Sequence, residues 1–237
     1  MSMKENDFQL LTRESIQNGA IRRHLEDAVR LGLFEPMSDT ARRASLEATI
    51  AANPGREVWV FGYGSLMWNP AFHFQERRHG LIRGYHRKFC LRTELGRGKP
   101  GNPGLMLALD NGGSCHGVAF RIAPEVVDEE LDIIWKREML AGAYRPQWLR
   151  VLDTRGEFNA ITFVIDRNFK HYVGRLPESE TVRLLATAGG RLGTCREYLE
   201  NTVQQLDLIG VRDGKMHALL SKVIKIAETK EIGSHGR

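Results

Sequence analysis

Short apolar runs in the middle of the chain predict strands. Residues 58–61, Val-Trp-Val-Phe, are four consecutive large apolar residues, which is typical of a strand covered on both faces. Residues 84–93 alternate apolar and polar positions, which predicts a half-buried strand. Residues 105–122 contain two apolar runs joined by Asn111-Gly112-Gly113, and residues 148–166 contain two runs separated near Gly156. Both of these segments predict hairpins, because their central residues tolerate a positive φ.

Helical periodicity appears on either side of this strand-rich region. Residues 37–53 offer Ser38 or Asp39 as an N-cap before a run of good helix formers. Pro124 suits the first turn of a second helix, over about 125–139, whose start is rich in acidic residues. Further helices are expected toward the C-terminus.

Two patterns predict the C-terminal helices. Thr194 and Glu197 have the spacing of a capping box, Thr-x-x-Glu, which predicts that a helix begins there. A last helix carries apolar residues at helical spacing, namely Met216, Leu219, Leu220 and Val223. Strands grouped in hairpins, with helices segregated around them, predict an α+β fold. We expect a helical N-terminal arm over residues 1–55 that packs on a domain over residues 56–237.

Composition bears on the cellular location that we expect for the protein. The 237 residues have a formal net charge of +5. No run approaches the roughly 18 apolar residues needed to span a membrane, and the first ten residues lack the apolar segment of a secretory signal. We therefore expect a cytoplasmic protein without a membrane partner.

The distribution of possible metal ligands predicts no metal site. Cys90, Cys115 and Cys195 are odd in number and form no Cys-x-x-Cys pair, which argues against a zinc site and a disulfide framework. No pair of histidines has ligand spacing. We expect the cysteines to be reduced and structural.

Basic residues gather between positions 77 and 88, namely Arg77, Arg78, Arg83, Arg87 and Lys88. They could mark a nucleic-acid surface, the solvated edge of an alternating strand, or a cleft that attracts a small anionic substrate. A nucleic-acid surface would need arginines interleaved with exposed aromatic residues. Tyr85 and Phe89 instead share a strand face with Arg87 and fit a core. The solvated edge is favoured, and no nucleic-acid partner is expected.

The loop Gly62-Tyr63-Gly64-Ser65, directly after the first strand, is the first candidate for binding chemistry. Its glycines let the backbone approach a ligand closely, and successive N–H groups in such a turn can bind an anion. Met67 stands where a dinucleotide-binding motif needs its third glycine, and a nucleophile elbow needs glycines at positions 63 and 67. The loop therefore matches neither motif, and a tight turn with no further role is the alternative.

Glu138 is the second candidate. On the predicted helix, Val127, Leu131, Ile134 and Glu138 fall within an arc of about 60°, so the glutamate occupies a core position. Burial raises the pKa of a carboxyl group, which is how a glutamate becomes a general base near neutral pH. The alternatives are an ion pair with Arg137, Arg145 or another arginine, and a helix end that exposes the carboxylate to solvent.

Four segments in order resemble the ChaC family of γ-glutamylcyclotransferases from about Val58 to the C-terminus: FGYGSLMWNP, GKPGNPGLMLALDNGGSCHGVAF, WKREMLAGAYRPQWL and GRLGTCREYLENTVQQLDLIGVRD. The N-terminal arm is similar to that of bacterial members. The resemblance implies a γ-glutamylcyclotransferase-like small mixed β-barrel with flanking helices. It also implies cleavage of glutathione to 5-oxoproline and cysteinylglycine, without a cofactor and without an obligate protein partner.

The resemblance also assigns residues. The family's Tyr-Gly-Ser loop matches Tyr63-Gly64-Ser65 and would hold the γ-glutamyl group, and its catalytic glutamate matches Glu138 after Arg137. The segment that follows is Gly142-Ala143-Tyr144 here, where some members have Gly-Gly-Tyr. The expected substrate contacts are Val60, Phe61, Gly62, Tyr63, Gly64, Ser65 and Tyr144. Tyr198 is either a supporting contact or a core residue.

Two other functions stay open on the sequence. The runner-up is a cyclotransferase that acts on other γ-glutamyl amino acids or amines, because the glutamyl half of the substrate would be read in the same way. A non-catalytic regulator of cation transport, a role once attached to the family by name, would act at a membrane. A basic amphipathic surface helix would support that role, and no segment predicts one convincingly.

Overall fold

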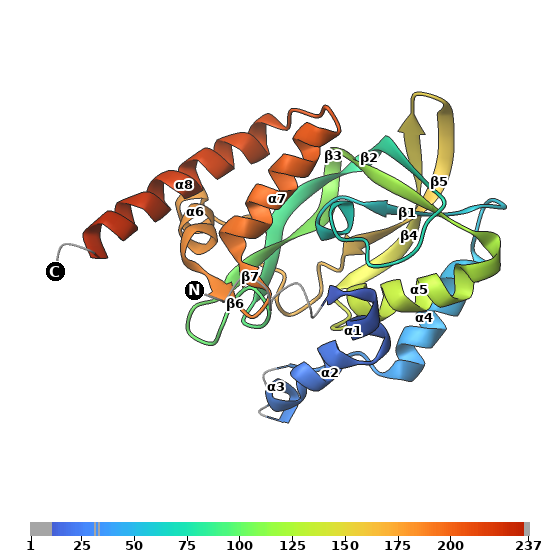
Figure 1. Ribbon diagram of the computed structural model, residues 1–237, viewed down its shortest axis with the longest axis horizontal. Helices are drawn as coiled ribbons and strands as arrows, with labels where there is room; N and C mark the ends of the chain where they lie inside the picture. Colours follow the sequence, from blue (N-terminus) through green and yellow to red (C-terminus); the bar gives the residue numbers. More distant parts are fainter. Residues whose placement is uncertain (1–10, 31, 33, 235–237) are drawn as a thin grey trace. The chain divides into compact units, whose positions relative to one another are not determined.

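The computed structural model describes residues 11–30, 32 and 34–234 and contains a closed barrel of five strands (Figure 1). The strands are β1 (Val58–Gly62), β2 (Glu76–Thr93), β3 (Gly104–Ile122), β4 (Tyr144–Asp153) and β5 (Gly156–Ile165). Their order around the barrel is β1-β3-β2-β4-β5, with a further pairing of β3 with β5. The predicted strand at residues 58–61 and the hairpin that turns near Gly156 are confirmed.

The chain divides into two compact units. The first contains the residues up to His86 together with Leu109–Phe169, and the second contains Arg87–Ala108 together with the residues from Lys170 onward. The long strands β2 and β3 therefore contribute residues to both units. The predicted base Glu138, the loop at residues 62–65 and Tyr144 all belong to the first unit.

The hairpin predicted over residues 105–122 is wrong, because this segment is one continuous strand, β3. Gly112 and Gly113 do have positive φ values, 96° and 75°. A bend inside a strand uses such glycines as readily as a turn does. The residues around them are exposed, and burial resumes at Cys115, so the gap between the apolar runs marks a solvent-exposed stretch of strand.

The helices of the first unit are those of the arm and α5. The arm forms α1 (Arg13–Gln17), α2 (Ala20–His24), α3 (Glu26–Arg30) and α4 (Asp39–Ala51), and α5 (Val127–Glu138) follows the 3-10 turn η3 (Pro124–Val126). Ser38 caps α4 as predicted, since its Oγ accepts a hydrogen bond from the N–H of Ala41. α4 lies beside α5, where the indole N–H of Trp135 donates to the hydroxyl of Ser45 at 3.3 Å (Figure 1).

The second unit contains the C-terminal helices. These are α6 (Glu178–Thr187), α7 (Cys195–Leu208) and α8 (Gly214–Ser234), with the short strands β6 (Gly189–Gly190) and β7 (Gly193–Thr194). The capping box of Thr194 and Glu197 is confirmed. The helices at residues 195–208 and 214–234 match the predicted periodicity, whereas α6 was not predicted as a separate element.

A close approach of β1 and β3 fixes the place where the loop after β1 begins. A Cβ added to Gly117 on β3 would lie 2.4 Å from the carbonyl oxygen of Gly62 and 2.5 Å from Cζ of Phe61. Neither neighbour can yield easily, because one is backbone and the other is a fully buried ring. Only a glycine at position 117 lets the end of β1 pack against β3 in this register.

We predict that Gly117→Ala destabilises the protein by about 1–3 kcal/mol, the usual cost of overpacking a core. The matched control is Gly214→Ala, because a Cβ at Gly214 meets nothing within 4 Å at the start of α8. Urea unfolding of both variants measures the effect. Equal free energies of unfolding for the two variants would contradict the close packing of β1 on β3.

Candidate active site

The loop that follows β1 is a tight turn built on Gly62. A Cβ at Gly62 would lie 2.9 Å from Cβ of Leu66, so the chain can fold back this closely only at a glycine. The loop leads into the short 3-10 helix η2 (Ser65–Met67), for which Gly64 is the N-cap. The loop is therefore a tight turn, and this conformation is compatible with a role in binding a ligand.

The loop's carbonyl groups are used within the turn, whereas two of its N–H groups are not. The N–H of Met67 donates to the oxygen of Gly64 at 2.9 Å, and the N–H of Asn69 donates to the oxygen of Ser65 at 2.9 Å. Among the described residues, the N–H groups of Gly64 and Ser65 donate to no acceptor. Adjacent backbone donors of this kind suit a carboxylate or a carbonyl oxygen that develops negative charge.

Three predicted substrate contacts have side chains that point into the core. Val60 and Phe61 are fully buried, and Val60 is paired on both sides, with Phe120 and Ile161. The hydroxyl of Tyr63 donates to the carbonyl oxygen of Phe163 on β5 at 2.8 Å. A substrate contact from these three residues would therefore have to use the backbone, and that assignment stays a prediction.

Glu138 is the last residue of α5, and its side chain is only 15% exposed. Leu131 and Ile134, which the helical periodicity places on the same face, are fully buried. Burial raises the pKa of the Glu138 carboxyl above its ordinary value, and the charge of Arg137 acts in the opposite direction. Both sequence interpretations of Glu138 hold together: it is a buried carboxylate and it is ion-paired.

Arg137 links the end of α5 to the loop. Its Nε lies 3.1 Å from Oε1 of Glu138, and one terminal nitrogen donates to the hydroxyl of Ser65 at 2.9 Å. The other terminal nitrogen donates to the carbonyl oxygen of Asn69 at 2.5 Å. The base candidate and the loop candidate, more than 70 residues apart in sequence, are thus joined through one side chain.

The two remaining tyrosines lie in different units. Tyr144 is half-buried at the first position of β4, opposite Ile165, a few residues after Glu138. Tyr198 is buried in the second unit, where the guanidinium of Arg97 lies 4.8 Å from its ring centroid and Phe89 packs edge-on. Tyr198 therefore fits the core alternative, and the role of Tyr144 stays a prediction.

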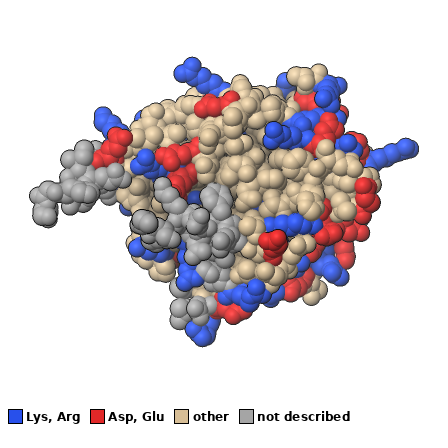
Figure 2. Space-filling model, in the orientation of Figure 1, with Lys and Arg blue, Asp and Glu red and all other residues tan. Residues whose placement is uncertain are grey.

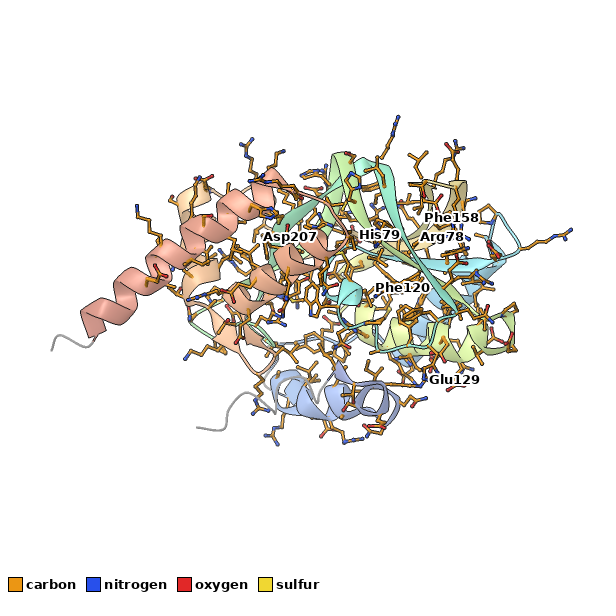
Figure 3. All side chains as sticks on the ribbon, turned by 45° about the horizontal axis from the view of Figure 1, so that its top comes forward. Arg78, His79, Phe120, Glu129, Phe158 and Asp207 are labelled. Atoms are coloured by element: carbon orange, nitrogen blue, oxygen red, sulfur yellow. The ribbon has the colours of Figure 1, made fainter. Side chains whose placement is uncertain are left out.

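The sequence did not indicate that the arm holds the far end of α5. Glu130 is completely buried, and its carboxylate pairs with Arg13 of α1 and accepts a hydrogen bond from the N–H of His73 at 2.9 Å. Arg13 also contacts Glu129, which Figure 3 shows on α5 beside the arm. The acidic residues at the start of α5 also suit the helix dipole, and their spacing alone cannot reveal a partner more than 100 residues away.

The basic segment at residues 77–88 is partly neutralised by acidic residues. The guanidinium of Arg78 pairs with Glu76 and lies 4.7 Å from the ring centroid of Trp59, with Phe158 close by (Figure 3). Arg87, in the second unit, pairs with Asp213 at 3.1 Å. Figure 2 shows Lys and Arg side chains interspersed with Asp and Glu on the face it draws. The contacts of Arg78 fit the solvated-edge interpretation, whereas Arg87 is buried and does not. The absence of a nucleic-acid partner stays a prediction.

All three cysteines are free and buried. No three His, Cys, Asp or Glu side chains of the described residues group as ligands for a metal ion. No helix in the described part of the chain has the length and apolar character that crossing a membrane requires.

Comparison with known proteins identifies the family. The sequence model of the ChaC-like protein family matches residues 58–226. The chain belongs to the ChaC-like family. It is 44% identical over 187 residues to the glutathione-specific γ-glutamylcyclotransferase of Escherichia coli (strain K12), a match that covers 78% of this chain and 81% of that protein. It is 30% identical over 192 residues to the glutathione-specific γ-glutamylcyclotransferase 1 of Rattus norvegicus, covering 76% and 86%.

The fold of this ChaC-like chain matches that of a solved relative. The crystal structure of a γ-glutamylcyclotransferase specific to glutathione from yeast aligns with a TM-score of 0.66 and 22% identity. The match covers 72% of this chain and 97% of that one. The α+β class with a small mixed barrel and flanking helices, expected from the sequence, is confirmed.

Proposed function

We propose that this ChaC-like chain cleaves glutathione to 5-oxoproline and cysteinylglycine by intramolecular transfer of the γ-glutamyl group. The observation that carries the proposal is the buried carboxylate of Glu138, tied through Arg137 to Ser65 in a loop with available N–H donors. The relatives named above, which are called glutathione-specific γ-glutamylcyclotransferases, support the choice of substrate.

The reaction requires a proton to leave one nitrogen and reach another. The α-amine of the γ-glutamyl group attacks its own γ-carbonyl carbon and closes a five-membered lactam ring, and the bond to the cysteine nitrogen breaks. The amine is mostly protonated at neutral pH, so it must lose a proton before or during attack. The cysteine nitrogen must gain a proton to leave as a free amine. Reactant and products balance without water or a cofactor.

Glu138 suits both proton transfers. A general base works best when its pKa lies near the pH of the reaction, and burial moves the pKa of this carboxyl in that direction. In its ionised form Glu138 takes the proton of the α-amine, and in its protonated form it returns a proton to the cysteine nitrogen. Its position at the end of α5, a rigid element, limits the geometries it can sample.

The Gly62–Ser65 loop supplies the orientation that ring closure needs. Holding the γ-glutamyl chain bent, with its amine against its carbonyl carbon, converts a rare conformation into the bound one. The N–H groups of Gly64 and Ser65 can donate hydrogen bonds either to the α-carboxylate or to the carbonyl oxygen as negative charge develops on it. Tyr144, just beyond Glu138 in sequence, is a further proposed contact. The cytoplasmic location stays a prediction.

We predict that Glu138→Gln keeps the fold and nearly the same affinity for glutathione but lowers kcat by at least about 10²- to 10⁴-fold, because the amide cannot take a proton. Formation of 5-oxoproline gives kcat, and calorimetric binding of glutathione to the variant gives its affinity. A well-folded variant that keeps a third of the wild-type kcat would remove Glu138 from the mechanism.

We predict that kcat/KM for glutathione exceeds that for γ-glutamyl-alanine, because contacts with the cysteinylglycine half would add transition-state binding. The rate with glutathione should not change in excess EDTA, since the described residues form no cluster of metal ligands. The two substrates, each assayed with and without chelator, test the two halves of the prediction separately. Equal or better turnover of γ-glutamyl-alanine would favour a cyclotransferase for other γ-glutamyl compounds, and a loss of activity that a divalent ion restores would contradict the metal-free site.

If the protein turned over no γ-glutamyl compound, the alternative function, a non-catalytic regulator of cation transport, would be favoured.

A further inference from the structure

One buried guanidinium contacts both parts of the candidate site. The side chain of Arg137 is only 5% exposed. It donates to the hydroxyl of Ser65 at 2.9 Å and to the carbonyl oxygen of Asn69 at 2.5 Å, with a third and longer contact to the carbonyl oxygen of Pro70 at 3.5 Å. Its Nε faces Oε1 of Glu138 at 3.1 Å.

These contacts use the shape of the guanidinium as well as its charge. Arginine presents its N–H donors in a rigid planar fork, so a partner on one edge fixes where the partners on the other edges can lie. The Nε edge faces the carboxylate of Glu138, and the terminal nitrogens face the loop. Lysine carries one ammonium group on a flexible stem and cannot hold Glu138, Ser65 and Asn69 in the same arrangement.

We propose that Arg137 is a positioning residue that sets the place of the Glu138 carboxylate relative to the Gly62–Ser65 loop. The proposal rests on the proposed function, because the distance between the Glu138 carboxylate and the loop matters only if Glu138 transfers protons to and from a group that the loop holds. In this proposal Arg137 contacts Glu138 and the loop and does not transfer a proton itself.

The charge of Arg137 provides a readout that a purely structural role would not change. Among the described residues, Arg137 is the charged group that acts on Glu138, and it favours the ionised carboxylate against the effect of burial. Removing that charge raises the pKa of Glu138 further. Because the base acts in its ionised form, the acidic limb of the activity profile then moves to higher pH, and activity is lost at neutral pH and partly regained as pH rises.

A purely structural Arg137 would behave differently. It would hold the carbonyl groups of Asn69 and Pro70 in the fold, and its loss would lower the free energy of unfolding. The folded fraction of the variant would then keep the wild-type kcat and the wild-type midpoint of the acidic limb. The pH profile therefore separates the two roles.

The experiment compares Arg137→Gln, Arg137→Lys and the control Lys136→Gln. Lys136 is the neighbour of Arg137, and its ammonium pairs with Asp132 at 2.6 Å on a different part of α5, so the control removes the same charge without touching the site. For each protein, kcat and KM for glutathione are measured across pH, and the folded fraction is measured by circular dichroism.

For Arg137→Gln we expect a midpoint of the acidic limb at higher pH and a kcat lower by about 10²-fold, the effect of a misplacement near 1 Å. Arg137→Lys keeps a charge near Glu138, so its midpoint should stay near the wild-type value while its kcat falls. Lys136→Gln should match the wild-type protein in both quantities.

A folded Arg137→Gln variant with wild-type kcat and midpoint would overturn the positioning role. If that variant does not fold, Arg137→Lys decides, and an unchanged kcat in the lysine variant would overturn the proposal. Failure of the proposed function looks different: the wild-type protein would form no 5-oxoproline, or Glu138→Gln would stay active. With an active wild-type protein and an inactive Glu138→Gln, only the positioning role is under test.

Discussion

The central constraint in this molecule is the burial of a carboxylate at the end of a helix. A buried charge is costly unless it is paired and hydrogen-bonded, and the fold meets that cost for Glu138 with the adjacent guanidinium of Arg137. Arg137 is buried as well, so it needs acceptors of its own, and it finds them in Ser65 and Asn69. The loop after β1 is thereby tied to the end of α5, and a single electrostatic requirement brings the two halves of the site together.

The rest of the first unit keeps this arrangement in register. β1 ends beside Gly117 of β3, which fixes where the loop begins. The buried Glu130 pairs with Arg13 at the start of α5, and the side chain of Asn69 donates to the carbonyl oxygen of Leu11. The arm therefore contacts both the helix and the loop segment that Arg137 holds. Breaking a buried ion pair by removing one partner typically costs about 3–5 kcal/mol, so the arm stabilises the unit that contains Glu138 and the loop.

The sequence predicted the burial of Glu138 more securely than the contacts around it. Helical periodicity placed Glu138 on a buried face, since the partners that define the face lie within about three turns of the same helix. The contacts of Arg137 and the partner of Glu130 depend on segments about 70 and more than 100 residues away, which no local pattern encodes. The hydrogen bond from the phenol of Tyr63 to the carbonyl oxygen of Phe163 is also a contact between distant segments, so no local pattern predicts it. The hairpin predicted around Gly112 and Gly113 was wrong, because the same positive φ occurs in a turn and in a bend within a strand.

A crystal structure of Glu138→Gln with bound glutathione would test the account most directly, because this variant should bind the substrate without consuming it. The account predicts that the α-amine lies about 2.6–3.2 Å from the amide oxygen of residue 138. It also predicts that the γ-glutamyl group accepts hydrogen bonds from the N–H groups of Gly64 and Ser65. Glutathione bound with its α-amine away from residue 138, or with its γ-glutamyl group away from the loop, would contradict it.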